Sequence, residues 1–186
     1  DVDDGGNAYN YGNISGFKTK NPTTLQAVRA NDAKDAIARS FYDGDGNVVG
    51  ALDANGYVTQ RVYNGSGEVV RIVRYANNLV NGYGGKTAAQ IRASGTFAEV
   101  LGAVGTNSRD ITTRYFYDGQ GRLRIALDAN SRPTEYIYDR PGNVTTRVDY
   151  GASIASPAST ANLTDVTAAI SAASLSTHAN SRYTSN

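Results

Sequence analysis

The stretch YDGDGNVVGALDANGYVTQRVYNGSGEVVRIVRY, from Tyr42 to Tyr75, dictates the architecture of this chain because it returns 75 residues later. The second copy, from Tyr117 to Tyr150, reads YDGQGRLRIALDANSRPTEYIYDRPGNVTTRVDY and is identical at 15 of 34 aligned positions without a gap. A tandem repeat is considered before any local motif, since one unit of such a protein buries its apolar surface against its neighbours. The 186-residue chain is therefore predicted to be built from a 75-residue module.

Each copy has an inner period of about ten residues, in which turn residues alternate with β-prone runs of roughly strand length. In the first copy the turns start at Asp43, Asp53 and Asn64, and each contains glycine within the next three residues. Glycine tolerates positive φ, and Asp and Asn side chains bond their own backbone. This spacing predicts an antiparallel meander. Alternation of apolar and other residues over Leu123–Leu127 predicts strands with one buried face.

The segments between the copies differ in character. Apolar residues recur at near-helical spacing over 86–104, with a break predicted at Ser94–Gly95, and more weakly over 23–40 and 163–175. We therefore expect a mainly β fold of tandem antiparallel meanders joined by short helical inserts. The predicted segments are a partial insert (1–40), the first repeat pair (41–75), an insert with a helix (76–115), the second repeat pair (116–150) and the insert of a truncated third repeat (151–186).

Tyrosine, aspartate, leucine and glycine mark the repeat at fixed intervals. The motif residues are Tyr42, Asp43, Gly46, Leu52, Tyr63, Gly67 and Tyr75 in the first copy and Tyr117, Asp118, Gly121, Leu127, Tyr138, Gly142 and Tyr150 in the second. With this Tyr-Asp-x-x-Gly pattern, followed by Leu-Asp-Ala-Asn, the sequence resembles the YD-repeat, or RHS-repeat, family of large bacterial secreted or cell-surface proteins. The resemblance implies a non-enzymatic, extracellular or cell-surface scaffold, because known members form adhesive scaffolds or β-sheet shells around a toxin domain.

Inserts of about 40 residues set this chain apart from the compact family pattern and favour a fibre or wall over a closed shell. The leading interpretation is a structural module whose sheet edges pair with copies of itself or with adjacent repeats of a longer chain. Two alternatives stay open: a carbohydrate-binding or adhesion module that uses some of the 13 tyrosines, with glycans as partners, and part of an RHS-type toxin-encapsulating shell.

Composition excludes several other classes. The 18 basic and 17 acidic residues give a net charge of +1, so no nucleic-acid footprint is predicted. No apolar run is long enough for a membrane span. Cysteine is absent, which removes disulfides and thiolate metal sites. The single histidine, His178, has no acidic neighbour in sequence to orient it, and no nucleophile motif is present, so an enzyme is not predicted.

Calcium is the one candidate ligand among ions and cofactors. Asp43, Asp45 and Asn47 follow the i, i+2, i+4 spacing that opens an oxygen-ligand loop. The glutamate that closes an EF-hand loop is missing, and the second copy carries Gln120 and Arg122 at ligand positions. An Asp/Gly turn that needs no ion explains the same residues and is the favoured interpretation.

Overall fold

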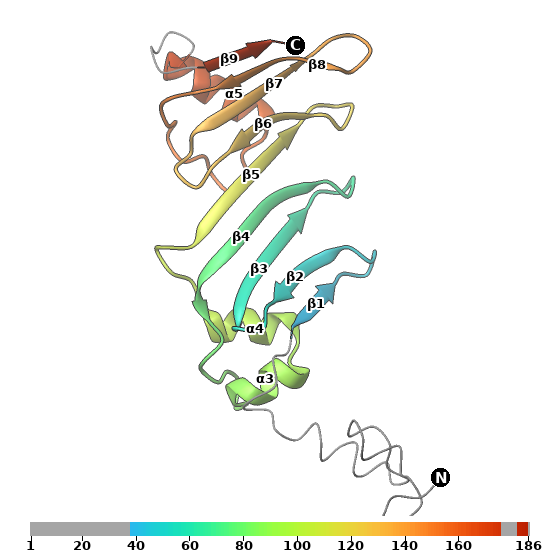
Figure 1. The fold of residues 1–186 in the computed structure, drawn as a ribbon, viewed down its shortest axis with the longest axis vertical. Helices are drawn as coiled ribbons and strands as arrows, with labels where there is room; N and C mark the ends of the chain where they lie inside the picture. Colours follow the sequence, from blue (N-terminus) through green and yellow to red (C-terminus); the bar gives the residue numbers. More distant parts are fainter. Residues whose placement is uncertain (1–37, 176–181, 186) are drawn as a thin grey trace, which may run out of the picture.

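Nine strands form one antiparallel sheet in the part of the chain that the structure, a computed structural model, describes: residues 38–175 and 182–185. The strands lie side by side in chain order, so every connection joins neighbours (Figure 1). The predicted helix over 23–40 and His178 fall essentially outside the described residues. The strands are β1 (Arg39–Tyr42), β2 (Val48–Leu52), β3 (Tyr57–Tyr63), β4 (Val69–Asn78), β5 (Ile111–Tyr117), β6 (Leu123–Leu127), β7 (Pro133–Tyr138), β8 (Val144–Asp149) and β9 (Arg182–Ser185). The prediction of a mainly β, antiparallel fold is confirmed.

In the described part of the chain, two helices follow the strands of the first unit and one helix follows those of the second. Helices α3 (Ala88–Ser94) and α4 (Phe97–Val104) are separated at Gly95, as the spacing predicts, and α5 is Leu163–Ala172. Each begins with a capping box, in which the N-cap side chain accepts from a backbone N–H three residues on and that residue's side chain bonds back. The N-caps are Thr87, Thr96 and Asn162.

Two hydrophobic cores lie between these helices and one face of the sheet, and the other face is left uncovered by them (Figure 1). Each core belongs to one 75-residue unit, and matched residues fill matched places: Phe41 and Phe116 on the strands, Ile91 and Val166 on the helices. Neither strands nor helices bury their apolar surface alone, so each insert is a structural part of its own unit. No described helix is long and apolar enough to cross a membrane.

Candidate functional site at the unit junction and the edge of β1

The predicted motif aspartates close the hairpin turns. The Asp43 Oδ1 atom accepts hydrogen bonds from the backbone N–H groups of Asp45 (3.0 Å) and Asn47 (2.8 Å), and Gly46 follows with a φ of 84°. Asp118 repeats this pattern with Gln120 (2.9 Å) and Arg122 (3.0 Å). These are Asx turns, in which a side-chain oxygen replaces a backbone acceptor.

The remaining turns show which part of the pattern is essential. Asn64 makes the same two bonds with an amide oxygen, to Ser66 (3.0 Å) and Glu68 (2.9 Å). Asp139 bonds Gly142 (2.8 Å) instead of the residue two positions on, because that residue is Pro141, which has no N–H. A side-chain oxygen is therefore required, and a negative charge is not.

The calcium candidates are engaged by this turn chemistry. Both oxygens of Asp43 accept hydrogen bonds, Oδ2 from the Asn47 amide at 3.1 Å. The side-chain and backbone hydrogen bonds of Asn47 lower the pKa of Asp43 below its ordinary value. In the second copy the Arg122 guanidinium donates to Asp118 Oδ2 at 2.9 Å. Within the described ranges no three His, Cys, Asp or Glu side chains gather into a metal-binding group. Calcium binding at Asp43, Asp45 and Asn47 stays a prediction.

Motif tyrosines join neighbouring strands through their hydroxyl groups, a role that the sequence pattern alone did not reveal. Tyr63 donates to the carbonyl oxygen of Val48 (3.0 Å), and Tyr138 donates to that of Leu123 (2.7 Å), the equivalent bond of the second unit. Each bond links the last residue of a strand to the first residue of the preceding strand. Each hydroxyl bond therefore joins the two strands at the end of the hairpin that lies opposite its connecting turn.

Tyr117 makes the corresponding bond across the junction between the two units. Its hydroxyl donates to the carbonyl oxygen of Val69 at 2.9 Å, joining the end of β5 to the start of β4. Burial and, secondarily, the nearby Glu68 carboxylate raise the pKa of Tyr117, so the phenol stays protonated and able to donate at neutral pH.

The last strand of each unit pairs with the strand that follows it through the same four positions. On β4 and β5, Arg71 faces Arg114 and Arg74 faces Ile111. On β8 and β9, Thr146 faces Ser185 and Asp149 faces Arg182. Thr146 and Asp149 lie 75 residues after Arg71 and Arg74, whereas Ser185 and Arg182 lie 71 residues after Arg114 and Ile111. The same edge of each unit is therefore extended by the next strand, although the second insert is four residues shorter.

The outer edge of β1 is the corresponding junction surface without a described partner. Over residues 38–175 and 182–185, β1 pairs with β2 and with no other strand. Tyr42 occupies the position of Tyr117, yet its side chain is 62% exposed and its hydroxyl bonds no described residue. An unpaired row of backbone N–H and C=O groups is a template for another strand.

An arginine on the first strand of each unit ties the insert to the sheet. Arg39 donates to the carbonyl oxygens of Ile91 (3.1 Å) and Arg92 (3.3 Å) in α3, and it lies 4.8 Å from the centre of the Phe41 ring. Arg114 likewise donates to the carbonyl oxygens of Pro157 and Ala158, both at 2.7 Å, and lies over Phe116. The first strand of each unit is thus hydrogen-bonded to the insert of the same unit.

Among residues 38–175, three tyrosines, the residue type on which the glycan hypothesis rests, are exposed. Tyr42 is 62% exposed, Tyr83 is 49% exposed and Tyr57 is 47% exposed. Tyr75 and Tyr150 instead turn inward and hydrogen-bond Gln60 (2.9 Å) and Glu135 (2.7 Å). Most motif tyrosines therefore serve the sheet itself.

Comparisons with known proteins place the fold in context. No family model matches the sequence, and no curated protein matches it. Two solved structures are similar over 60% of this chain, the crystal structure of TcdB2-TccC3-Cdc42 and that of TcdB2-TccC3 without its hypervariable C-terminal region. In both, the identity is 19%, the TM-score is 0.42 and the match covers 5% of the other chain.

Proposed function

We propose that this chain is a non-enzymatic structural module of a larger extracellular or cell-surface repeat protein. Its work is to extend a continuous β-sheet. The observation that carries this proposal is that equivalent positions of β4 and β8 both pair with the strand that follows, while the edge of β1 has no described partner. Repeat architectures propagate in this way, with each unit contacting its neighbours.

The strand that fits the β1 edge is of the β8 type. In the register of β4 and β5, Arg39 would lie opposite the position that Arg71 and Thr146 share, and the Tyr42 hydroxyl would reach the carbonyl oxygen of the residue equivalent to Val69 and Val144. Main-chain hydrogen bonds supply the affinity of such strand addition, and alternate side chains supply the specificity. An adjacent repeat of a longer chain provides a strand with this pattern, and another copy of the chain provides it when β9 leaves the edge of β8.

A synthetic peptide tests the strand addition directly. The peptide spans Asp139–Tyr150, and the protein is isotope-labelled for NMR. We expect saturable shifts and slowed hydrogen exchange at the backbone amides of β1, together with at least a fivefold weaker affinity for the Tyr42→Phe variant. A peptide of the same composition in scrambled order is the control. Equal binding of the scrambled peptide, or shifts that avoid β1, would contradict the proposal.

The same junction could build either the wall of an enclosing shell or a fibre. The two assemblies differ in how the sheet curves over many units. Electron microscopy of the native assembly distinguishes a closed body from a filament.

Glycan binding is the alternative function, and the half-exposed Tyr57 ring is its candidate contact. Loss of binding to a glycan array in Tyr57→Ala, with Tyr83→Ala as the exposure-matched control, would favour that function.

A further inference from the structure

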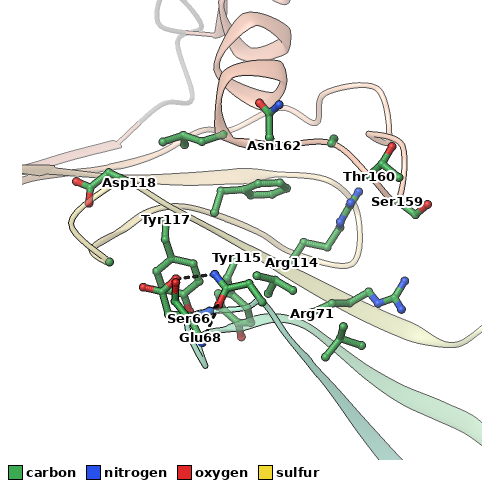
Figure 2. A pocket seen from close by; sticks show the side chains of 18 of the residues that line it. Ser66, Glu68, Arg71, Arg114, Tyr115, Tyr117, Asp118, Ser159, Thr160 and Asn162 are labelled. Atoms are coloured by element: carbon green, nitrogen blue, oxygen red, sulfur yellow. Dashed lines mark hydrogen bonds between the residues drawn. The ribbon is translucent and has the colours of Figure 1, made fainter.

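A groove of about 920 Å³ lies on the insert-covered face at the junction of the two units, between the β3–β4 and β5–β6 turns and the loop before α5 (Figure 2). Two arginines line it, Arg71 from β4 and Arg114 from β5, directly opposite each other in the register. Like charges facing each other on neighbouring strands destabilise a sheet. The pairing of Arg71 with Arg114 is therefore expected to destabilise the sheet at this groove.

Internal comparison shows that the junction does not need this pair. The next junction places Thr146 and Ser185 at the two positions, in the same backbone register. At the β4–β5 junction Arg114 has a structural role, because it donates hydrogen bonds to the carbonyl oxygens of Pro157 and Ala158. Arg39, at the equivalent position of the first unit, has the same role. The unexplained residue is Arg71.

No described residue neutralises Arg71. It has no hydrogen bond and no ion pair in the described part of the chain, and its Nε atom is buried without an acceptor. Its β3 neighbour in the register is Val62, which offers none. A buried donor left without a partner destabilises the folded chain. Burial and, secondarily, the charge of Arg71 lower the pKa of Arg114. The second of these causes is the repulsion between the two guanidinium groups.

The acidic groups of the groove are engaged elsewhere. Glu68 accepts from the Asn64 amide at 2.6 Å, and Asp118 is paired with Arg122 at 2.8 Å. Figure 2 shows Arg114 directed toward the loop with Ser159 and Thr160, whereas Glu68 and Asp118 lie toward the turn end of the groove. The arginine end is thus positively charged and open, with serine and threonine hydroxyls at its border.

We propose that this groove binds an oxyanion group, a sulfate, phosphate or carboxylate, through the Arg71 guanidinium with Arg114 as the second cation. A planar guanidinium recognises such groups with paired N–H donors. The volume is within the range of small-ligand sites. The site is internal to the chain, so it does not depend on whether β1 accepts another strand.

Matched substitutions test the site. Arg71→Thr copies the residue of the next junction, and Arg74→Thr removes an exposed arginine three residues along the same strand, which lies outside the groove. Sodium sulfate, sodium phosphate and sodium glucuronate are titrated at constant ionic strength set with sodium chloride, and binding is followed by NMR shifts and by the unfolding temperature.

We expect saturable binding of at least one of the three anions, weakened tenfold or more in Arg71→Thr and less than twofold in Arg74→Thr. Without added oxyanion, Arg71→Thr is expected to unfold at a higher temperature than the native chain because the like-charge pair is gone. Preference for sulfate or phosphate identifies a tetrahedral anion, and preference for glucuronate identifies an acidic sugar. Absence of saturable binding for all three, or equal binding by Arg71→Thr, would overturn the proposal.

Discussion

Gly50 and Phe97 form a complementary pair in which the missing side chain of one makes room for the ring of the other. A Cβ atom on Gly50 would lie 2.2 Å from Phe97 Cε2, and the ring instead stacks on Phe41 with centroids 5.0 Å apart. Seventy-five residues later the strand position is Ile125, which is buried, whereas the aligned helix residue, Ala172, is exposed at the end of α5. The first unit therefore fills this part of its core with a helix side chain, and the second unit has a strand side chain at the same strand position.

We expect Gly50→Ala to destabilise the chain by about 1–3 kcal/mol, because the added methyl group overpacks the layer. The double variant Gly50→Ile, Phe97→Ala places the strand residue of the second unit, Ile125, in the space that the ring vacates, and it is expected to recover a large part of that loss. Chemical unfolding of the single and double variants measures the coupling. Additive losses would show that the two positions do not share space.

Removal of the hydroxyl at Tyr117 is expected to cost about 0.5–1.5 kcal/mol, the usual net value of a hydrogen bond. Tyr117→Phe deletes the bond to the Val69 carbonyl across the unit junction. Tyr42→Phe is the matched control, because the equivalent hydroxyl at the β1 edge has no described partner. Thermal unfolding of both variants at low protein concentration checks this difference. An equal loss in Tyr42→Phe would mean that its hydroxyl is already engaged within the chain.

The turn aspartates are expected to make stability depend on acid pH. Side-chain and backbone bonds from Asn47 and Asn143 lower the pKa values of Asp43 and Asp139; at Asp118, burial opposes the shift, but Arg122 and the backbone amides outweigh it. Because folded pKa values lie below the unfolded ones, the stabilisation is present above the ordinary aspartate pKa of about 4 and is lost as pH falls through the lowered values.

Replacing these three aspartates with asparagine tests the assignment, since Asn64 already closes an equivalent turn. The triple variant is expected to fold and to lose stability less steeply between about pH 4 and pH 2 than the native chain. Urea unfolding across this range provides the measurement. An unchanged pH slope would place the acid sensitivity in other carboxylates.

Ser131 and Gly56 occupy equivalent turn positions, and we expect substitutions at the two positions to change stability in opposite directions. Ser131 has a φ of 58°, so Ser131→Gly is expected to stabilise the chain by roughly 0.5–1 kcal/mol through relief of the left-handed backbone. Gly56 has a φ of 88°, and a Cβ there would lie 2.7 Å from Arg92 Nη2. Gly56→Ala is therefore expected to destabilise by about 1–3 kcal/mol, as measured by thermal unfolding. Similar effects of the two substitutions would show that backbone strain does not distinguish the turns.

The sequence by itself determined the strands, the turns and their order, because these depend on local chemistry. Period-two alternation, a positive-φ glycine and an aspartate that bonds its own loop act within a few residues, and the 75-residue repeat guaranteed that both units would use them alike. The helix break at Gly95 was also local. The capping boxes at Thr87 and Thr96 were visible as residue patterns and would have located the helix starts.

Only the tertiary structure decided which residues far apart in the sequence contact one another. The bond from Tyr117 to Val69 joins residues 48 positions apart, and the contact of Arg71 with Arg114 depends on a register that no local pattern specifies. The exchange of volume between Gly50 and Phe97 likewise links a strand to a helix of the following insert. Such contacts depend on how whole layers pack, and packing is a property of the assembled core and not of any one segment.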